Sequence, residues 1–189
     1  MRKLILTNFQ SPGDIVMLTA AVRDLHRCHP GRFVTDVRTS CPDLWLFNPH
    51  VNPLDEEDPE VEVIRCEYPL IHRRNQEPWH FLHGFVHFLA EPLDVPLRVT
   101  AFKGDIHISD AEKDWFSTVE SLTGSSPPFW LLTSGGKNDY TIKWWDRAPL
   151  EAVVDLRGAT TLRQLVRLMY HAQGAVSAVS LTVHLAAAV

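Results

Sequence analysis

One carboxylate near the start of the chain occupies a position where a catalytic group could act. Asp14 closes the segment Ser11-Pro-Gly-Asp14, which follows an apolar run typical of a strand, residues 2–8, and precedes an amphipathic helical pattern. Open α/β sheets bind ligands at such strand-to-helix loops, where a carboxylate can act as a general base. The same side chain could instead cap the helix by accepting backbone N–H groups at its positive end.

A second loop that could bind a ligand follows an expected strand at residues 129–133. It combines Thr133, Ser134 and Gly135 with the downstream Lys143. Backbone N–H groups in such a loop can surround phosphate oxygens, and a lysine can balance their charge. A solvated turn anchored by the neighbouring tryptophans would explain the same composition. The chain has no G-x-G-x-x-G segment and no P-loop, so neither a dinucleotide fingerprint nor a P-loop NTPase is indicated.

Two further groups of side chains are weaker candidates. His80, His83 and His87 would share one face of a helix and could bind zinc, or they could form a polar stripe opposite three phenylalanines. Arg73 and Arg74 form a small basic spot that is either an ordinary surface loop or a contact for a sugar phosphate. A Gly-x-Ser-x-Gly elbow is missing, so a serine nucleophile has little support.

Composition narrows the classes of function. The 189 residues carry a net charge of −5, which argues against nucleic-acid binding. The three cysteines form no Cys-x-x-Cys pair, so neither a thiolate zinc site nor a disulfide framework is expected. No apolar run reaches the length of a membrane span, and the first residues do not form a signal peptide. We therefore expect a cytoplasmic protein.

The elements that must position these residues alternate between strand and helix patterns. This alternation predicts an α/β fold with mainly parallel sheets. Capping boxes start two helices, at Ser109 with Glu112 and at Thr161 with Gln164, and residues 125–128 are the best linker. Strands are expected at residues 2–8, 33–39, 61–66, 129–133, 153–156 and 175–179, a short turn or helix at 44–47, and helices after Asp14, at 79–90, at 109–123, from 161, and at 183–189.

Five segments in order resemble glycosyltransferase family 9, the ADP-heptose:lipopolysaccharide heptosyltransferases. The family's opening Gly-Asp, Thr and Ala-x-Arg/Lys-x-Leu pattern is similar to residues 13–25, and its Lys-x-Trp motif is similar to residues 143–145. Its "HLAAA" helix is similar to residues 184–188. The remaining two matches are residues 47–49 and the stretch 155–165.

The resemblance implies a GT-B architecture of two Rossmann-like domains facing a cleft. Residues 1–125 would form the acceptor-side domain and residues 126–189 a partial donor-side domain. It also implies an inverting transfer of a heptose-like sugar, from a nucleotide sugar such as ADP-heptose to a glycan or a lipid-linked, lipopolysaccharide-type acceptor. No metal and no further cofactor would be needed. The protein would then be cytoplasmic or peripheral at the inner face of the membrane.

The resemblance also assigns roles to individual residues. Asp14 matches the proposed base, which removes the proton of the acceptor hydroxyl. The region that holds the donor diphosphate matches Thr133, Ser134, Gly135, Lys143 and His184. On the acceptor side we expect Gly13, Arg73 and Arg74.

The chain also departs from the family pattern. Residues 179–181 lack the aspartate that usually precedes the HLAAA histidine, and residues 146–152 replace a full helix and strand. The sequence ends inside an apolar helix, so we expect an incomplete donor domain that could self-associate. Two alternatives to the transferase stay open: a binding-only GT-B fragment without turnover, and a metal-dependent hydrolase using the three histidines.

Overall fold

The computed structural model describes most of the chain. The described residues are 1–67, 76, 80–114, 118–124, 128–133, 154, 156, 158–177 and 180–189. Several predicted features lie outside them, namely most of the linker, the loop that follows residue 133 and the Lys-Trp-Trp segment at 143–145.

The N-terminal half is built on a parallel sheet in the order β2-β1-β3. Its strands are β1 (Arg2–Asn8), β2 (Phe33–Thr39) and β3 (Val61–Arg65). The middle strand β1 has fully buried side chains at three successive positions, 4 to 6, because helices and loops cover both of its faces. The chain crosses from one side of β1 to the other between β2 and β3, which makes a topological switch point at the carboxyl end of β1.

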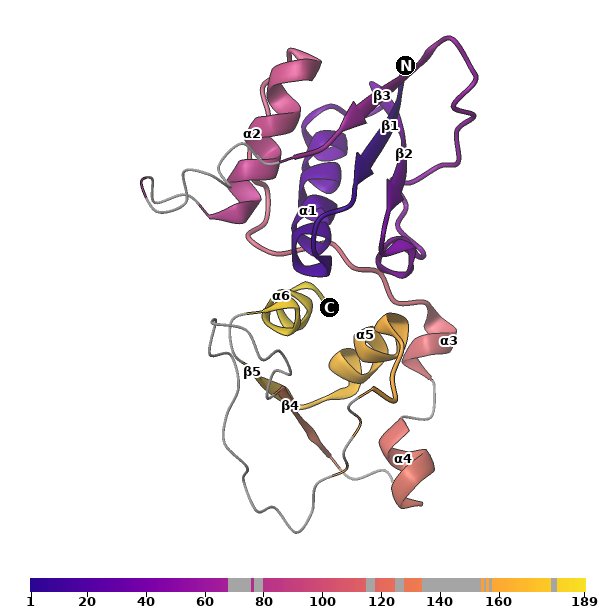
Figure 1. Cartoon of the computed structure of the whole chain (residues 1–189), viewed down its shortest axis with the longest axis vertical. Coiled ribbons are helices and arrows are strands. Elements are labelled where there is room, and N and C mark those ends of the chain that lie inside the picture. Colours follow the sequence, from indigo (N-terminus) through magenta and orange to yellow (C-terminus); the bar gives the residue numbers. More distant parts are fainter. Residues whose placement is uncertain are drawn as a thin grey trace.

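Two helices pack beside this sheet (Figure 1). The first, α1 (Pro12–Cys28), begins with a proline at its first position, where no helical N–H is lost. Its face toward the core carries the apolar residues 15, 18, 22 and 25, as the spacing predicted. The second, α2 (Phe81–Leu93), ends at Asp94 in a left-handed conformation.

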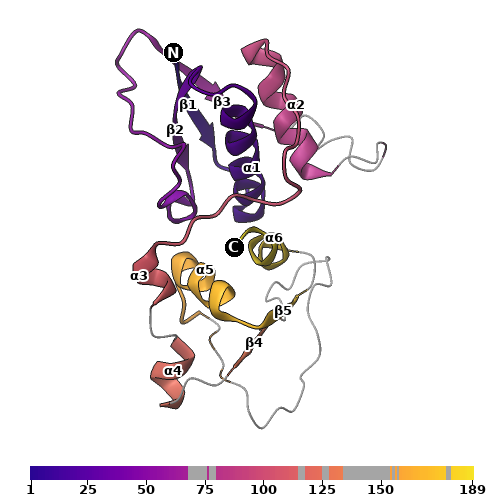
Figure 2. The same ribbon diagram turned by 180° about the vertical axis from the view of Figure 1, so that it is seen from behind.

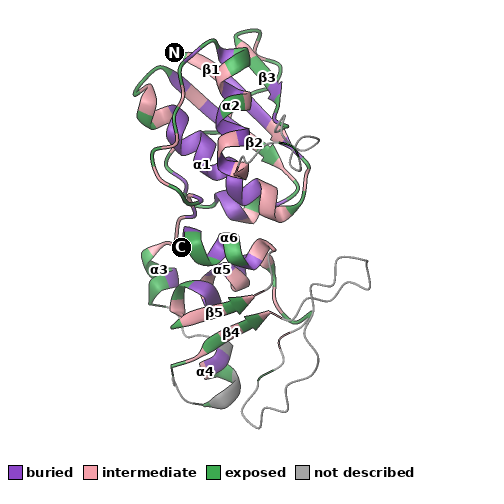
Figure 3. Ribbon diagram, turned by 90° about the vertical axis from the view of Figure 1, so that its left-hand side faces the viewer, coloured by how far each residue is buried: buried purple, intermediate pink, exposed green. Residues whose placement is uncertain are grey.

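The C-terminal half holds a second, smaller parallel sheet, β4 (Trp130–Thr133) with β5 (Gly174–Ser177). Figure 3 shows that its strands are less buried than those of the first sheet. The other elements of the described chain are η1 (Pro42–Trp45), α3 (Asp110–Lys113), α4 (Thr118–Thr123), α5 (Leu162–His171) and α6 (Leu181–Ala188).

The sequence predicted most of these elements, although several limits differ: α6 begins at Leu181 rather than at residue 183, and α2 ends at Leu93 rather than at residue 90. The helix expected at 109–123 is two helices, α3 and α4. In the strand expected at 153–156, the described residues Val154 and Leu156 lie outside any strand. The helix expected from residue 79 begins at Phe81, because the extended backbone of His80 forms its N-cap. Both capping boxes form, the one at α3 and the one at α5.

The two halves join through residues 101–105, which α1 holds in place. Arg23 is 1% exposed and donates to the carbonyl oxygens of Ala101 and Lys103, at 2.7 and 2.8 Å. The hydroxyl of Thr19 accepts a 2.8 Å hydrogen bond from the backbone N–H of Asp105. Thr19 and Arg23 of the family-like segment thus fix the path of the chain between the halves.

A mostly buried ion pair makes a second connection. Arg163 of α5 contacts Glu112 of α3 through two hydrogen bonds of 2.6 and 2.7 Å. The same guanidinium donates to the carbonyl oxygen of Asp43 in η1 and lies 5.3 Å from the ring centre of Phe47. Because η1 and Phe47 belong to the N-terminal half, Arg163 ties the two halves together. The pKa of Glu112 falls to about 2, first because Arg163 hydrogen-bonds its carboxylate.

Candidate active site

The carboxyl ends of both parallel sheets point toward one junction. At the end of β1, the side-chain amide of Asn8 donates to the carbonyl oxygen of Cys66, just after β3, at 2.8 Å. The chain then turns into α1. On the other side, β5 leads to the N-terminus of α6. Figures 1 and 2 show α6 next to the N-terminal end of α1, so the two strand-end edges face each other.

Gly13 and His184 meet at this junction. A β-carbon placed on Gly13 would lie 3.4 Å from Cδ2 of His184 and 3.7 Å from Cα of Leu181. The first turn of α1 therefore contacts the first turn of α6. A residue that the sequence assigned to the acceptor side touches one assigned to the donor side.

Asp14 lies beside this contact. Its half-buried carboxylate accepts hydrogen bonds from the hydroxyl of Ser11 at 2.7 Å and from the backbone N–H of Ser11 at 3.2 Å. These bonds match the capping alternative, in which the side chain stabilises the start of α1. The pKa of His184 is lowered by burial, and the nearby charge of Asp14 opposes that shift. The carboxylate and a neutral imidazole are thus neighbours across the junction.

Hydroxyl groups gather where β4 and β5 meet α6. Thr133, at the end of β4, pairs with Ser177 at the end of β5. The hydroxyl of Ser177 bonds to that of Thr182 in the first turn of α6, and Ser180 bonds to the same hydroxyl at 3.0 Å. Backbone N–H groups at a helix N-terminus favour anions. Sequence reasoning found Thr133 but missed the other three, which carry no motif of their own.

An aromatic cluster borders the junction on the α2 side. The ring of Phe81 lies 6.4 Å from that of His184 in an edge-to-face arrangement. The tilted rings of His80 and Phe102 have centroids 4.4 Å apart, and His83 lies 6.0 Å from the ring of Phe102. The sequence singled out the two histidines but not Phe102, because their proximity depends on contacts distant in the chain.

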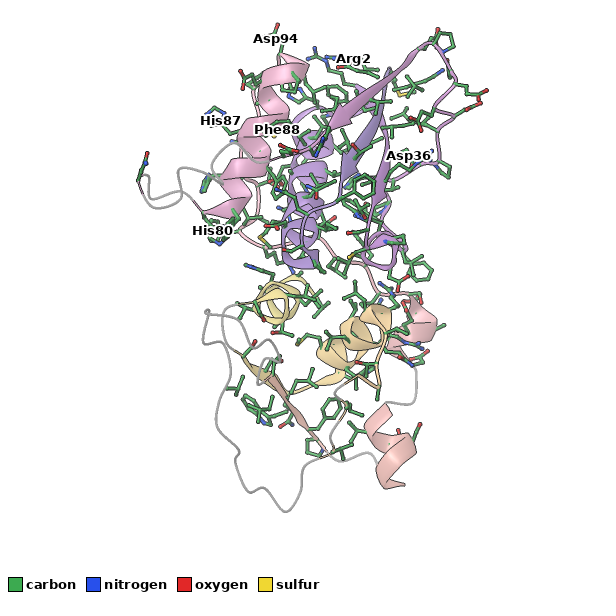
Figure 4. All side chains as sticks on the ribbon, in the orientation of Figure 1. Arg2, Asp36, His80, His87, Phe88 and Asp94 are labelled. Carbon is green, nitrogen blue, oxygen red and sulfur yellow. The ribbon has the colours of Figure 1, made fainter. Side chains whose placement is uncertain are left out.

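The zinc hypothesis for three histidines receives no geometric support. His80 caps α2 through Nδ1, which accepts from the backbone N–H of Leu82 at 3.2 Å, so it does not continue the helical face of His83 and His87. In Figure 4, His80 lies at the end of α2 nearest α6, whereas His87 points outward farther along the helix. Within the described ranges, no three His, Cys, Asp or Glu side chains are grouped to hold a metal ion.

The remaining predicted site residues lie outside the described part of the chain. They are Ser134, Gly135 and Lys143 on the donor side and Arg73 and Arg74 on the acceptor side. Their roles stay predictions. The structure brings Gly13 into contact with His184 and Asp14 close enough to influence its pKa, and Thr133 is joined to α6 through Ser177.

Comparison with solved structures identifies the architecture. A glycosyl transferase family 9 protein from Veillonella parvula DSM 2008 matches with a TM-score of 0.71 over 98% of this chain and 77% of its own, at 11% identity. The chain has a GT-B fold. The same fold occurs in the E. coli ADP-heptose lps heptosyltransferase II, with a TM-score of 0.61 and 16% identity over 98% and 81% of the two chains.

A third structure is the E. coli heptosyltransferase WaaC with ADP-2-deoxy-2-fluoro heptose. It matches this GT-B chain with a TM-score of 0.60 and 12% identity over 98% and 85% of the two chains. No protein-family model and no curated protein matches the sequence. Among the described helices, none is long and apolar enough to cross a membrane. At these identities the likeness establishes the fold, and the activity has to be argued from the site.

Proposed function

We propose that this GT-B chain transfers a heptose-like sugar from a nucleotide sugar to a hydroxyl of a glycan or lipopolysaccharide-type acceptor, with inversion. The observation that supports this most is the meeting of Gly13 and His184, with Asp14 beside them, where the carboxyl ends of the two sheets face each other. Each sheet presents its ligand-binding edge to the same place, which suits a reaction between two substrates.

Asp14 acts as the general base in this proposal. Its carboxylate takes the proton of the acceptor hydroxyl while that oxygen bonds to the anomeric carbon of the donor. The bond from the anomeric carbon to the nucleoside diphosphate breaks on the opposite face, which inverts the configuration. The capping bonds from Ser11 fix the orientation of the carboxylate, so a role in the cap is compatible with one in catalysis.

The donor lies on the α6 side. Negative charge develops on the leaving diphosphate and is stabilised by the N-terminus of α6 and by Lys143. Thr133, Ser134 and Gly135 supply hydrogen-bond donors from the end of β4. His184, kept neutral by burial, donates one hydrogen bond to the donor. No metal ion is required, because these groups carry the charge.

The acceptor lies on the side of the first sheet. Gly13 leaves room beside Asp14, and Arg73 and Arg74 would bind acidic groups of a lipopolysaccharide-type glycan. The predicted domain division at residue 125 would put residues 1–125 on the acceptor side and 126–189 on the donor side. Since the halves join at residues 101–105, α3, which packs against α5, and α4 would then be counted with the acceptor domain. The two substrates would meet in the cytoplasm at the inner face of the membrane.

The test is release of nucleoside diphosphate from a panel of nucleotide sugars that includes ADP-heptose, with and without a lipopolysaccharide-core acceptor. We expect release that needs both substrates. A binding-only fragment is the second candidate, favoured by the hydrogen bonds through which Asp14 already serves the helix cap. Saturable donor binding without any release would select that alternative.

A further inference from the structure

Phe102 is an exposed aromatic side chain on a rigid support. The residue is 61% exposed, although it lies in the tightly held connection between the two halves. The backbone N–H of Lys103 donates to the carbonyl oxygen of Ala101 at 2.9 Å, so Phe102 is the central residue of a three-residue turn. Buried Arg23 binds the carbonyl oxygens on both sides of it. The ring is therefore presented to solvent by a preorganised backbone.

Two imidazoles flank this ring. The planes of His80 and Phe102 are tilted by 46° at a centroid distance of 4.4 Å, and those of His83 and Phe102 by 50° at 6.0 Å. His80 accepts the N–H of Leu82 through Nδ1, which leaves the proton of the neutral ring on Nε2. The pKa of His80 is lowered, mainly by burial and further by His184 and His83, so this ring is neutral at pH 7.

The cluster is continuous with the candidate active site. Phe81 lies between the two, next to His80 and in edge-to-face contact with His184. Two residues after Phe102, Gly104 is packed between Val16 of α1 and Ala188 of α6. The platform therefore combines the start of α2 with the connection between the halves, and it borders the junction that holds Asp14.

We propose that Phe102, with His80 and His83, is a stacking subsite for a pyranose ring of the acceptor. This inference rests on the proposed sugar transfer and names the part of the site that recognises the acceptor. The C–H face of a pyranose packs on an aromatic ring, while imidazole nitrogens exchange hydrogen bonds with its hydroxyl groups. Both imidazoles are tilted to the phenyl ring, so they do not form the parallel slot that would suit a planar nucleobase.

The platform can be tested without turnover. Saturation-transfer NMR would be recorded with the full chain and the methyl α-glycosides of glucose, galactose and mannose as probes. We expect transfer to the ring protons of at least one glycoside. Replacing the aromatic face, Phe102→Leu, should weaken binding of that glycoside about fivefold, and Phe102→Trp should retain it. The exposed Phe47, which lies against Arg163 instead, gives the matched control Phe47→Leu, with unchanged binding.

The outcomes distinguish failure of the stacking subsite from failure of the proposed sugar transfer. Absence of transfer to all three glycosides in the wild type, equal binding by Phe102→Leu, or loss of the signal on adding adenosine would overturn the platform. If the wild type releases no nucleoside diphosphate but Phe102→Leu still loses glycoside binding, the platform stands and the transferase proposal fails. If release is Asp14-dependent while the acceptor KM is unchanged in Phe102→Leu, the platform is wrong and the transferase proposal stands.

Discussion

Gly13 of α1 and His184 of α6 lie so close that a β-carbon on the glycine would be 3.4 Å from the imidazole Cδ2. The contact joins the first turn of the helix that follows β1 to the first turn of the helix that follows β5. It brings together two residues that are 171 positions apart in the sequence. Their juxtaposition is the geometric basis of the proposed function.

Gly104 should tolerate no side chain. A β-carbon there would lie 2.8 Å from Cγ1 of Val16, 2.9 Å from Cβ of Ala188 and 3.1 Å from the carbonyl oxygen of Val16. Gly104→Ala must push α1 and α6 apart, and we expect a loss of about 1–3 kcal/mol in the free energy of unfolding by urea. Gly13→Ala is the matched control, since its nearest contact is an ordinary 3.4 Å. Equal stability of the two variants would contradict this packing.

Removing Arg163 should destabilise the connection between the two halves. Arg163→Met leaves the carboxylate of Glu112 mostly buried without its main partner, so we expect a loss of about 3 kcal/mol in urea unfolding. Adding Glu112→Leu should recover part of it. The control is Lys113→Met, which breaks the exposed pair with Asp110 and should leave the midpoint unchanged. If Arg163→Met and Lys113→Met unfold at the same urea midpoint, Arg163 does not stabilise the connection between the two halves.

Mild acid should destabilise the fold through His26. Burial, and then the stacked His50, lowers the pKa of His26 from 6.5 to about 4. Between these two pH values the unfolded chain binds a proton that the folded chain does not, so stability falls as the pH is lowered from 6.5 to 4. Across this range, the free energy of unfolding by urea should decrease less steeply with falling pH in His26→Gln than in the wild type. The difference in slope should correspond to up to about one bound proton. An unchanged slope would show that His26 is not the responsible group.

Stronger acid should act through Glu112. Its pKa is about 2 in the folded protein and 4.5 in the reference state, so its contribution is complete above 4.5 and is lost as the pH falls toward 2. Arg163→Met raises the folded-state pKa and should flatten this part of the stability curve. Parallel curves for wild type and variant between these pH values would contradict the role of the ion pair.

Local signals made several elements predictable. Strands β1 and β2 have the predicted limits, because their apolar runs are bounded by polar and turn residues. The capping boxes at Ser109 and Thr161 are contained within four residues each, so they could be read directly. The helix expected at 109–123 was wrong, because the capping box fixes where a helix starts and not where it ends.

The long-range contacts could not be predicted from the sequence. Arg163 finds Glu112 at a separation of 51 residues, and Arg23 finds Ala101 at 78. Nothing in the local pattern marks such partners, so the sequence did not show which residues the two arginines contact. For the same reason Phe102 was not recognised beside His80. Asp14 was recognised from its place between a strand and a helix, His184 only through the resemblance, and their proximity came from the fold.

The central claim is that Asp14 is the base of a sugar transfer. The most direct measurement is the rate of nucleoside diphosphate release by Asp14→Asn, which keeps an oxygen to accept the bonds from Ser11 but loses the proton acceptor. The control is Asp110→Asn, an exposed acidic residue in the first turn of α3. We predict a loss of at least about 100-fold for Asp14→Asn, unchanged release for the control and the same folded spectrum for both. Release by Asp14→Asn at the wild-type rate would contradict the account.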